Sequence, residues 1–317
     1  MRAGRKAALI LWEKVMSEKG KREVKKTLVG VGFALPIIIG ILGFTLFPML
    51  VSLYNSFFEY DVLNPRKFIG FENYIRPFKN APYGYWDQGF SSALFTTFIY
   101  ALVSIPLGLV LSYLLALLVN VNLKGSTVFR VLYYVPVILP AVVSGLLWSD
   151  LLDVDFGFVN ILLRKMGLPD CTFFSSKDTA MATFIGMSLF GLGGNIILWT
   201  AQFKNIPVSM YEAAELEGAS SFRKLISITI PLSSAMIFYM FVTGVIGSLQ
   251  VFAQSFLLTG VAPDALNFYV VYVYNQAFSR MSMGYASALS WILFIIIGLI
   301  TMLIFKTSKW VYYGEEQ

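Results

Sequence analysis

Six long stretches free of charged residues place the strongest limit on how this chain can fold. They cover residues 27–57, 90–123, 131–149, 179–203, 225–256 and 284–305. About 20 consecutive apolar residues are enough for an α-helix to cross the hydrocarbon core of a bilayer. The sequence therefore predicts an all-α integral membrane protein with six transmembrane helices.

The composition supports this prediction and excludes several classes of protein. Hydrophobic residues make up 57% of the 317 residues and charged residues only 13%, whereas a soluble domain carries about 25% charged residues. A soluble enzyme, a DNA-binding protein and a secreted scaffold are therefore excluded. The net charge of +6 gives no reason to expect a nucleic-acid partner, because residues 1–26 hold nine Lys/Arg against three Asp/Glu and the remainder balances at fifteen each.

The chain also lacks the side chains that carry most site chemistry. It has no His and a single Cys, Cys171, so the commonest metal ligand, the usual acid/base at neutral pH and an internal disulfide are all absent. We expect no catalytic, cofactor or metal site in this chain.

The distribution of Lys and Arg indicates the orientation of the chain, because these residues favour cytoplasmic segments. The face that holds both termini has sixteen of them and the other face has eight, which predicts that both termini are cytoplasmic. The predicted parts are a basic cytoplasmic segment at 1–26, one six-helix membrane domain at 27–305 and a cytoplasmic tail at 306–317. Residues 1–26 fit an interfacial helix, with Leu9, Trp12 and Met16 on one face, and fit a solvated tail equally well.

Two segments on the outer face have predicted structure of their own. Residues 157–166 have the pattern of a short amphipathic helix between Asp-rich ends. The uncharged stretch 225–263 is longer than one span needs. We therefore expect the fifth helix to break at 260–263, before a partly immersed, Tyr-rich segment at 266–278.

The interiors of the predicted spans contain no Asp, Glu, Lys or Arg, and the nearest such residue, Asp150, lies at the outer end of the third span. Ion-coupled carriers and pumps usually need an ionisable residue inside the membrane. The chain also lacks a phosphate-binding P-loop, because its one Gly-Lys pair, Gly20-Lys21, is followed by Arg22 rather than by Ser or Thr. Uphill transport would need energy from a partner, since this chain is not expected to hydrolyse ATP.

The longest loop on the cytoplasmic face, residues 204–231, has the pattern of a hook made of two short helices. Pro207 suits the first position of a helix, and good helix formers follow it. Gly218 ends that helix as a left-handed C-cap, Ser220 or Ser221 caps a second helix, and Pro231 marks its passage into the fifth span.

The first helix of this hook has two distinct sides. Its acidic edge is formed by Glu212, Glu215 and Glu217. Its apolar side is formed by Val208, Tyr211 and Leu216. So short a helix is marginal on its own, which favours a docking partner that completes it, although helix chemistry alone fits a solvated connecting loop equally well.

The hook resembles the EAA loop of binding-protein-dependent ABC importer permeases. The pattern in that family is Glu-Ala-Ala, three residues, Gly, nine residues and Ile-x-Leu-Pro. This chain has Glu212-Ala213-Ala214, Gly218 and Ile228-Thr229-Ile230-Pro231, with Ile230 in place of Leu. The spacing is intact, so the match is highly specific.

Further motifs resemble the carbohydrate-uptake (sugar and oligosaccharide) branch of this family, and the resemblance covers roughly residues 28–310. They are Phe-Ile-Gly-Phe-Glu-Asn-Tyr at 68–74, Arg130, Pro136, Pro140, Trp148, Gly157, Asn160, Leu-Thr-Gly at 258–260 with Pro263, Tyr-Asn-Gln-Ala-Phe at 274–278, and Gly-Tyr-Ala-Ser-Ala at 284–288. Three positions depart from the family pattern. Glu217 stands where Asp is commoner, Ala235 where a second Pro is frequent, and Val261-Ala262 interrupts a usual Gly-Gly-Pro.

The resemblance implies a transport subunit in the cytoplasmic membrane of a bacterium or archaeon, surrounded by membrane lipid. It implies a second, similar permease, two ATP-binding subunits that hold ATP and Mg, and an extracytoplasmic solute-binding protein that delivers a carbohydrate. By the same resemblance, the residues of the ATPase-coupling loop are Pro207, Tyr211, Glu212, Ala213, Ala214, Gly218, Ala219 and Pro231.

In this family the solute crosses between the two permeases, past the spans that flank the EAA loop. Small and aromatic residues in these spans recur at helical spacing, and nearby amides add uncharged hydrogen-bonding groups. The candidate solute path consists of Met187, Phe190, Gly191, Gly194, Asn195, Gly247, Ser248, Gln250 and Val251. The alternative is that the small residues are helix-packing contacts.

Two other functions remain to be compared with an importer permease. A stand-alone facilitator or secondary carrier for a neutral polar solute is compatible with charge-free spans, although the hook argues against it. A membrane-embedded enzyme would need a constellation of Asp, His or Cys at membrane level, and the sequence has none.

Overall fold

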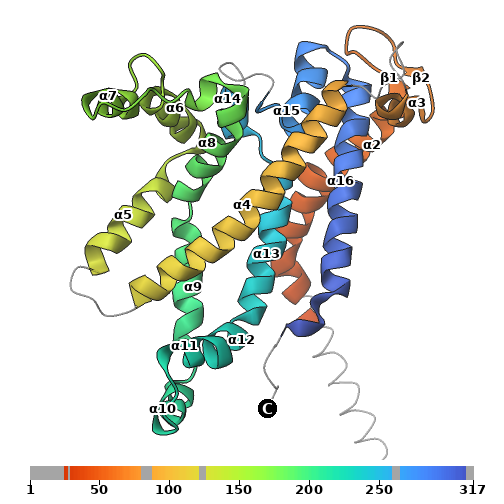
Figure 1. Ribbon diagram of the computed structural model, residues 1–317. Coiled ribbons are helices and arrows are strands. Elements are labelled where there is room, and N and C mark those ends of the chain that lie inside the picture. The colour runs from red at the N-terminus through yellow and green to blue at the C-terminus, as the bar shows by residue number, and fades with distance from the viewer. Residues whose placement is uncertain (1–24, 28, 80–87, 121–125, 259–264, 312–317) are drawn as a thin grey trace, which may run out of the picture.

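Apolar helices account for most of the computed structural model, which describes residues 25–27, 29–79, 88–120, 126–258 and 265–311 (Figure 1). Within these ranges, four helices are long and apolar enough to cross a membrane, and the number rises to six if each of two bent helix pairs forms one span. The four are Lys25–Asn55, Gly89–Asn120, Ser234–Leu258 and Met283–Lys306. The chain is a multi-pass membrane protein.

The elements follow one another along the chain with short connections. The first span contains a π-helical turn, η1 (Leu42–Leu46), followed by α2 (Phe47–Asn55). The elements that follow the first span, up to residue 175, are β1 (Phe58–Glu59), β2 (Lys67–Phe68), α3 (Glu72–Ile75), η2 (Arg76–Phe78), α4 (Gln88–Asn120), α5 (Ser126–Ile138), α6 (Ala141–Leu151), α7 (Phe158–Lys165) and η3 (Phe173–Ser175). The remaining elements are α8 (Lys177–Phe190), α9 (Gly193–Lys204), α10 (Val208–Leu216), α11 (Ser221–Lys224), η4 (Leu225–Thr229), α12 (Ile230–Leu232), α13 (Ser234–Leu249), α14 (Ala253–Leu258), α15 (Tyr269–Tyr274), η5 (Asn275–Ser279), α16 (Met283–Lys306) and η6 (Ser308–Trp310).

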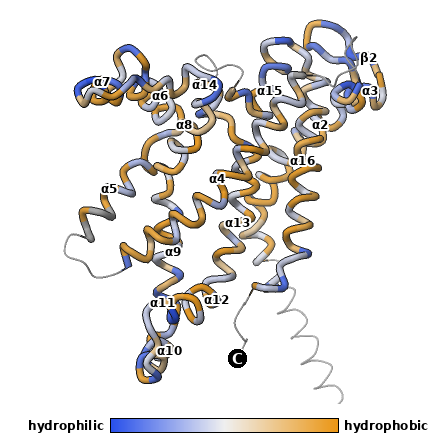
Figure 2. Tube along the Cα trace, viewed as in Figure 1, coloured by the Kyte–Doolittle hydropathy of each residue, from blue (hydrophilic) through white to orange (hydrophobic). Residues whose placement is uncertain are grey.

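The distribution of hydropathy along the bundle fits this membrane assignment (Figure 2). The long helices are apolar over most of their length. Hydrophilic residues gather at both ends of the molecule, around α10 and α11 at one end and around α3, β2 and α7 at the other (Figure 2). The predicted short helix at 157–166 is present as α7, and the Tyr-rich segment at 266–278 contains α15 and the π-helical turn η5.

The predicted third span, 131–149, is not one straight helix. It is broken into α5 and α6, with a bend of 110° between them. Pro140 is the N-cap of α6 and has an extended ψ of 143°. Its ring disfavours a helical conformation in the preceding residue, Leu139, and Pro140 has no N–H for a helical hydrogen bond, so α5 ends before it. The pair forms an arm at one side of the bundle (Figure 1).

The predicted fourth span, 179–203, is also bent. There is a bend of 46° between its two halves, α8 and α9. Helix α8 ends at Phe190, with Gly191 as its C-cap, and α9 begins at Gly193. Several glycines close together weaken the helix at this point, because each costs about 1 kcal/mol relative to alanine.

The predicted fifth span, 225–256, contains two interruptions. The first interruption is at Ser233, between α12 and α13. The second is at Gln250–Phe252, between α13 and α14. The break predicted at 260–263 lies outside the described residues. Helix α13 is thus the continuous part of this span and packs against α4 and α16.

The end of the bundle nearest to the hook at 204–231 has its own apolar core, which we call the inner cluster. Its buried members come from α4, α9, α13 and the connection after α9: Ala116, Val119, Ile196, Trp199, Phe203, Ile206 and Met240. The indole N–H of Trp199 donates a buried hydrogen bond to the hydroxyl of Ser112 on α4 at 3.0 Å. This cluster fixes the base from which the hook at 204–231 leaves the bundle.

Candidate coupling loop and solute cavity

The hook at 204–231 projects beyond the inner end of the long helices (Figure 1). Its first helix, α10, runs from Val208 to Leu216. Pro207 is the residue before this helix, with φ −58° and ψ 128°, so it is the N-cap and not the first helical residue that the sequence predicted. The difference is one position, and the fixed φ of proline still sets the direction in which the helix starts.

The turn after α10 is a Schellman motif centred on Gly218. The Gly218 N–H donates to the Glu215 carbonyl at 3.0 Å, and the Ala219 N–H donates to the Ala214 carbonyl at 2.9 Å. Gly218 has a φ of +75°, as this motif requires. A Cβ at Gly218 would have no heavy atom within 4 Å. Backbone conformation, and not lack of space, is therefore what calls for glycine here.

The second arm of the hook begins as predicted. The Ser220 hydroxyl accepts a hydrogen bond from the Arg223 N–H at 3.3 Å and so caps α11. Helix α11 continues into the π-helical turn η4 and then into α12, which contains Pro231. The hook therefore joins α13 through three short helical turns.

Two side-chain contacts tie α10 to the second arm. The Tyr211 and Thr229 hydroxyls are hydrogen-bonded at 2.9 Å, and the Lys224 ammonium pairs with the Glu215 carboxylate at 2.6 Å. Tyr211 is half-buried and packs on the inner cluster. The predicted apolar side of α10 was therefore wrong in one member, because Tyr211 faces the bundle.

The face of α10 that carries Val208, Glu212 and Leu216 is open. Val208 is 68% exposed and Leu216 is 92% exposed. Glu212 and Ala213 are also exposed, whereas Ala214 and Ala219 are half-buried. Exposed leucine and valine beside a carboxylate give a surface that can bury apolar area against another protein and accept charge-assisted hydrogen bonds.

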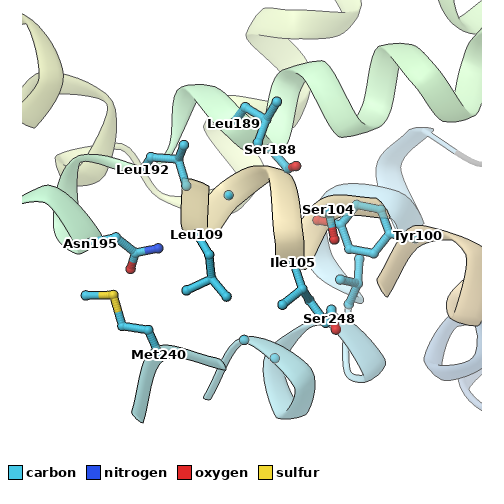
Figure 3. A pocket seen from close by; sticks show the side chains of 14 residues that line it. Tyr100, Ser104, Ile105, Leu109, Ser188, Leu189, Leu192, Asn195, Met240 and Ser248 are labelled. Carbon is cyan, nitrogen blue, oxygen red and sulfur yellow. The ribbon is translucent and has the colours of Figure 1, made fainter. Parts of the chain in front are cut away.

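A cavity of about 180 Å³ lies among the long helices (Figure 3). Helices α4, α8, α9 and α13 all contribute to its wall. The lining residues are Tyr100, Ser104, Ile105, Gly108, Leu109, Ser188, Leu189, Leu192, Asn195, Met240, Gly244, Gly247, Ser248 and Val251. None of these side chains is ionisable at neutral pH, since tyrosine ionises only near pH 10.

The polar groups of the cavity are hydroxyls and one amide. Figure 3 shows the hydroxyls of Tyr100, Ser104, Ser188 and Ser248 towards one end and the Asn195 amide at the other. The Ser188 hydroxyl donates to the Ile185 carbonyl at 2.7 Å and the Ser248 hydroxyl to the Val245 carbonyl at 3.1 Å. Because each hydroxyl proton is used within its own helix, the serine oxygens remain as acceptors for hydrogen bonds from a solute.

The structure brings together only part of the predicted solute path. Asn195, Gly247, Ser248 and Val251 line the cavity. Met187, Phe190, Gly191, Gly194 and Gln250 do not.

The bends in the fourth and fifth spans explain why these five residues do not line the cavity. Met187 is buried in a different core, whereas Phe190 is 62% exposed and packs against Trp148. Because α8 ends before Gly191, the regular spacing that placed these residues and Gly194 on one face does not hold. Gln250 lies just beyond the end of α13 and is exposed.

Helix α4 supplies five lining residues that the sequence prediction missed. Tyr100, Ser104 and Gly108 recur every four residues on an otherwise apolar helix, and Ser112 continues the series. Residues four apart share a helix face. This stripe of polar and small residues was the available signal.

Comparison with known proteins decides the family. A probable ABC transporter permease protein of Bacillus subtilis strain 168, YesP, is 33% identical to the chain over 306 residues, which cover 94% of this chain and 97% of that protein. The chain belongs to the ABC transporter permease family. The family predicted from the 204–231 loop and from the further motifs in the sequence is thereby confirmed. No protein-family model matches the permease.

Two further comparisons agree with this assignment. The permease is 29% identical over 252 residues to SmoG of Agrobacterium fabrum strain C58, a permease protein of a sulfoquinovosyl glycerol transport system, with 78% of this chain and 80% of that protein covered. It shares its fold with a chain in the crystal structure of a bacterial alginate ABC transporter in complex with a periplasmic protein that holds an alginate pentasaccharide. The TM-score is 0.81 at 21% identity, with 91% of this chain and 96% of that chain covered.

Proposed function

We propose that this permease is the membrane subunit of an ATP-driven importer that translocates a carbohydrate, with an oligosaccharide as the expected class. The observation that carries the proposal is a cavity lined by uncharged hydroxyl and amide groups, joined by one helix, α13, to a hook that leaves the inner end of the bundle. The importer would operate in the cytoplasmic membrane of a bacterium or archaeon, with six spans and both termini in the cytoplasm.

The chemistry of the cavity supports a hydroxyl-rich, uncharged solute. The Ser188 and Ser248 oxygens can accept hydrogen bonds from sugar hydroxyls, and the Asn195 amide can both donate and accept. Tyr100 and Leu109 supply apolar surface for the C–H faces of a sugar ring. A charged solute would find no countercharge among the lining residues, and an unpaired charge in such a place is costly. Among the relatives, the sugar-derivative system of SmoG supports a carbohydrate as the solute, and the absence of charge on that solute is inferred from the cavity alone.

The missing energy source supports a multi-subunit assembly. The spans hold no ionisable residue for ion coupling and the chain has no P-loop. We infer two ATP-binding subunits that hold ATP and Mg, a second permease, and an extracytoplasmic binding protein that delivers the solute. One ATP-binding subunit would dock on the exposed side of α10, around Val208, Glu212 and Leu216.

The geometry then gives a route from ATP hydrolysis to the solute. A displacement of α10 would reach α13 through α11, η4 and α12. Helix α13 contributes Met240, Gly244, Gly247 and Ser248 to the cavity wall. Movement of this helix would change the width of the cavity directly.

Reconstitution in proteoliposomes tests the proposal. The permease alone should neither hydrolyse ATP nor accumulate solute, whereas the full complex should show ATPase activity that neutral oligosaccharides stimulate through the binding protein. A panel of neutral oligosaccharides, anionic oligosaccharides, amino acids and inorganic ions separates the solute classes. Transport by the isolated chain would establish a facilitator instead, and stimulation by amino acids or ions alone would overturn the carbohydrate assignment.

A further inference from the structure

The geometry points to a clamp inside the hook that holds α10 at a fixed angle to the base of the fifth span. The clamp consists of Tyr211 and Glu215 on α10 and of Lys224 and Thr229 on the second arm. These four are positioning residues for the coupling of ATP hydrolysis to transport. The inference rests on the proposed function, in which α10 receives the movement of an ATP-binding subunit.

The four side chains form a closed ring of contacts. Tyr211 and Glu215 are four residues apart and so share one face of α10. Tyr211 contacts Thr229 at 2.9 Å, and Glu215 contacts Lys224 at 2.6 Å. The Thr229 hydroxyl also donates to the Lys224 carbonyl at 3.4 Å, which closes the ring within the second arm. A helix held at two points a full turn apart cannot pivot about either one.

The direction of the hydrogen bonds follows from this ring. Because the Thr229 proton is directed to the Lys224 carbonyl, the Thr229 oxygen accepts from the Tyr211 hydroxyl. Thr229 is five residues after Lys224, and the π-helical turn η4 brings its hydroxyl to the Lys224 carbonyl. Across this turn the Ile230 N–H donates to the Leu225 carbonyl. Single π-helical turns are rare and frequently mark functional positions.

Burial decides which contact dominates. Thr229 is only 6% exposed, and the Tyr211 ring packs on the inner cluster with α4 and α9. The Glu215 side chain, by contrast, is 63% exposed. Exposed ion pairs contribute little because water and salt screen them, so the Tyr211–Thr229 hydrogen bond is the main tie and the ion pair is a secondary one.

The experiment uses the complete complex with Tyr211→Phe, Thr229→Val and the double variant. Two quantities are measured: retention of the ATP-binding subunit in a pull-down, and solute taken up per ATP hydrolysed. Tyr239→Phe and Thr243→Val are matched controls, because both residues are exposed on α13 and the Thr243 hydroxyl bonds only within its own helix. Thr229→Ser keeps the hydroxyl and serves as the rescue.

We expect each single variant to retain the ATP-binding subunit within about twofold while uptake per ATP falls by about threefold to tenfold, the factor that corresponds to one lost hydrogen bond. The double variant should be no worse than either single one, because both remove the same bond. Thr229→Ser and the two controls should behave as wild type.

Three results would overturn the clamp. They are unchanged uptake per ATP in the single variants, additive losses in the double variant, or loss of the ATP-binding subunit from the Tyr211→Phe complex, which would make the pair a binding determinant. Failure of the proposed function itself has another signature, since Glu212→Ala and Leu216→Asp would then leave ATPase association unchanged.

Discussion

The hook and the cavity are built from the chain in opposite ways. All residues of the hook lie within 204–231, and its polar contacts, which are the caps, the Schellman turn, the hydrogen bonds and the ion pair, join residues at most 18 positions apart. The cavity gathers residues from Tyr100 to Val251 on four helices, two of which end at bends. Local chemistry determines the first region, and long-range packing determines the second.

The largest expected effect concerns the bend between α8 and α9, which lies in the wall of the cavity. A Cβ at Gly193 would meet the Tyr133 carbonyl oxygen of α5 at 2.0 Å, whereas a Cβ at Gly194 would have no neighbour within 4 Å. Gly193→Ala should therefore push α5 off α9 and cost at least about 1–3 kcal/mol. Gly194→Ala is the matched control, with a neutral or slightly stabilising effect. Thermal unfolding of both variants in detergent checks this, and equal melting temperatures would show that α5 does not pack here.

The second prediction concerns the turn of the hook. Gly218→Val should greatly reduce uptake and ATPase association, because a β-branched residue rarely adopts a φ near +75° and the left-handed conformation costs roughly 1–2 kcal/mol. Gly218→Asn should lose much less, because asparagine tolerates this conformation. Membrane insertion should be normal in both. Pull-down and uptake assays check both variants. Equal losses would indicate that position 218 must have no side chain, and that its positive φ is not what calls for glycine.

A third prediction addresses the cavity. Gly247 lines it and a Cβ there would meet nothing within 4 Å, so Gly247→Trp should fill the cavity and block uptake while the complex stays assembled. Gly191→Trp is the contrasting variant, because Gly191 lies outside the lining residues. Size-exclusion chromatography reports assembly. Disrupted assembly with Gly247→Trp would favour a helix-packing role for this residue.

The smallest expected effect concerns the inner cluster that supports the hook. Ser112→Ala removes the acceptor of the Trp199 indole N–H. Hydrogen bonds between membrane helices contribute about 0.6 kcal/mol on average, so we expect a melting temperature lower by only a degree or two. Trp199→Phe in the Ser112→Ala background should add less than it does in the wild type. A fully additive loss would mean that the hydrogen bond does not couple the two helices.

The sequence predicted the hook well because its signals are local. Gly218 and Ser220 act through residues within four positions of themselves, so spacing alone located the turn and the second cap. Tyr211 was misplaced because its side chain is oriented by Thr229, 18 residues away. The sequence could not supply that partner, since periodicity alone treats every apolar residue of a short helix as part of one face.

The cavity was harder to predict because its geometry depends on where helices stop being straight. Pro140 and the glycines around Gly191 were visible in the sequence, but the angles of 110° and 46° are set by packing against neighbouring helices. Once α8 and α9 are separate, Met187 and Gly194 no longer share a face. Tyr100 and Ser104 lie on α4, which does not flank the hook, so a prediction built on the flanking spans does not include them.

The central claim is that the exposed side of α10 meets the ATP-binding subunit, and site-directed crosslinking tests it most directly. With Cys171 replaced by Ser, Leu216→Cys on α10 and Phe156→Cys on the outer face provide two exposed thiols, since the native residues are 92% and 65% exposed. A thiol-to-amine crosslinker is applied to the intact complex in membranes. We predict a crosslink from residue 216 to the ATP-binding subunit and none from residue 156. A crosslink from residue 156 to the ATP-binding subunit would contradict the account. So would the absence of a crosslink from residue 216 to that subunit in a complex that hydrolyses ATP.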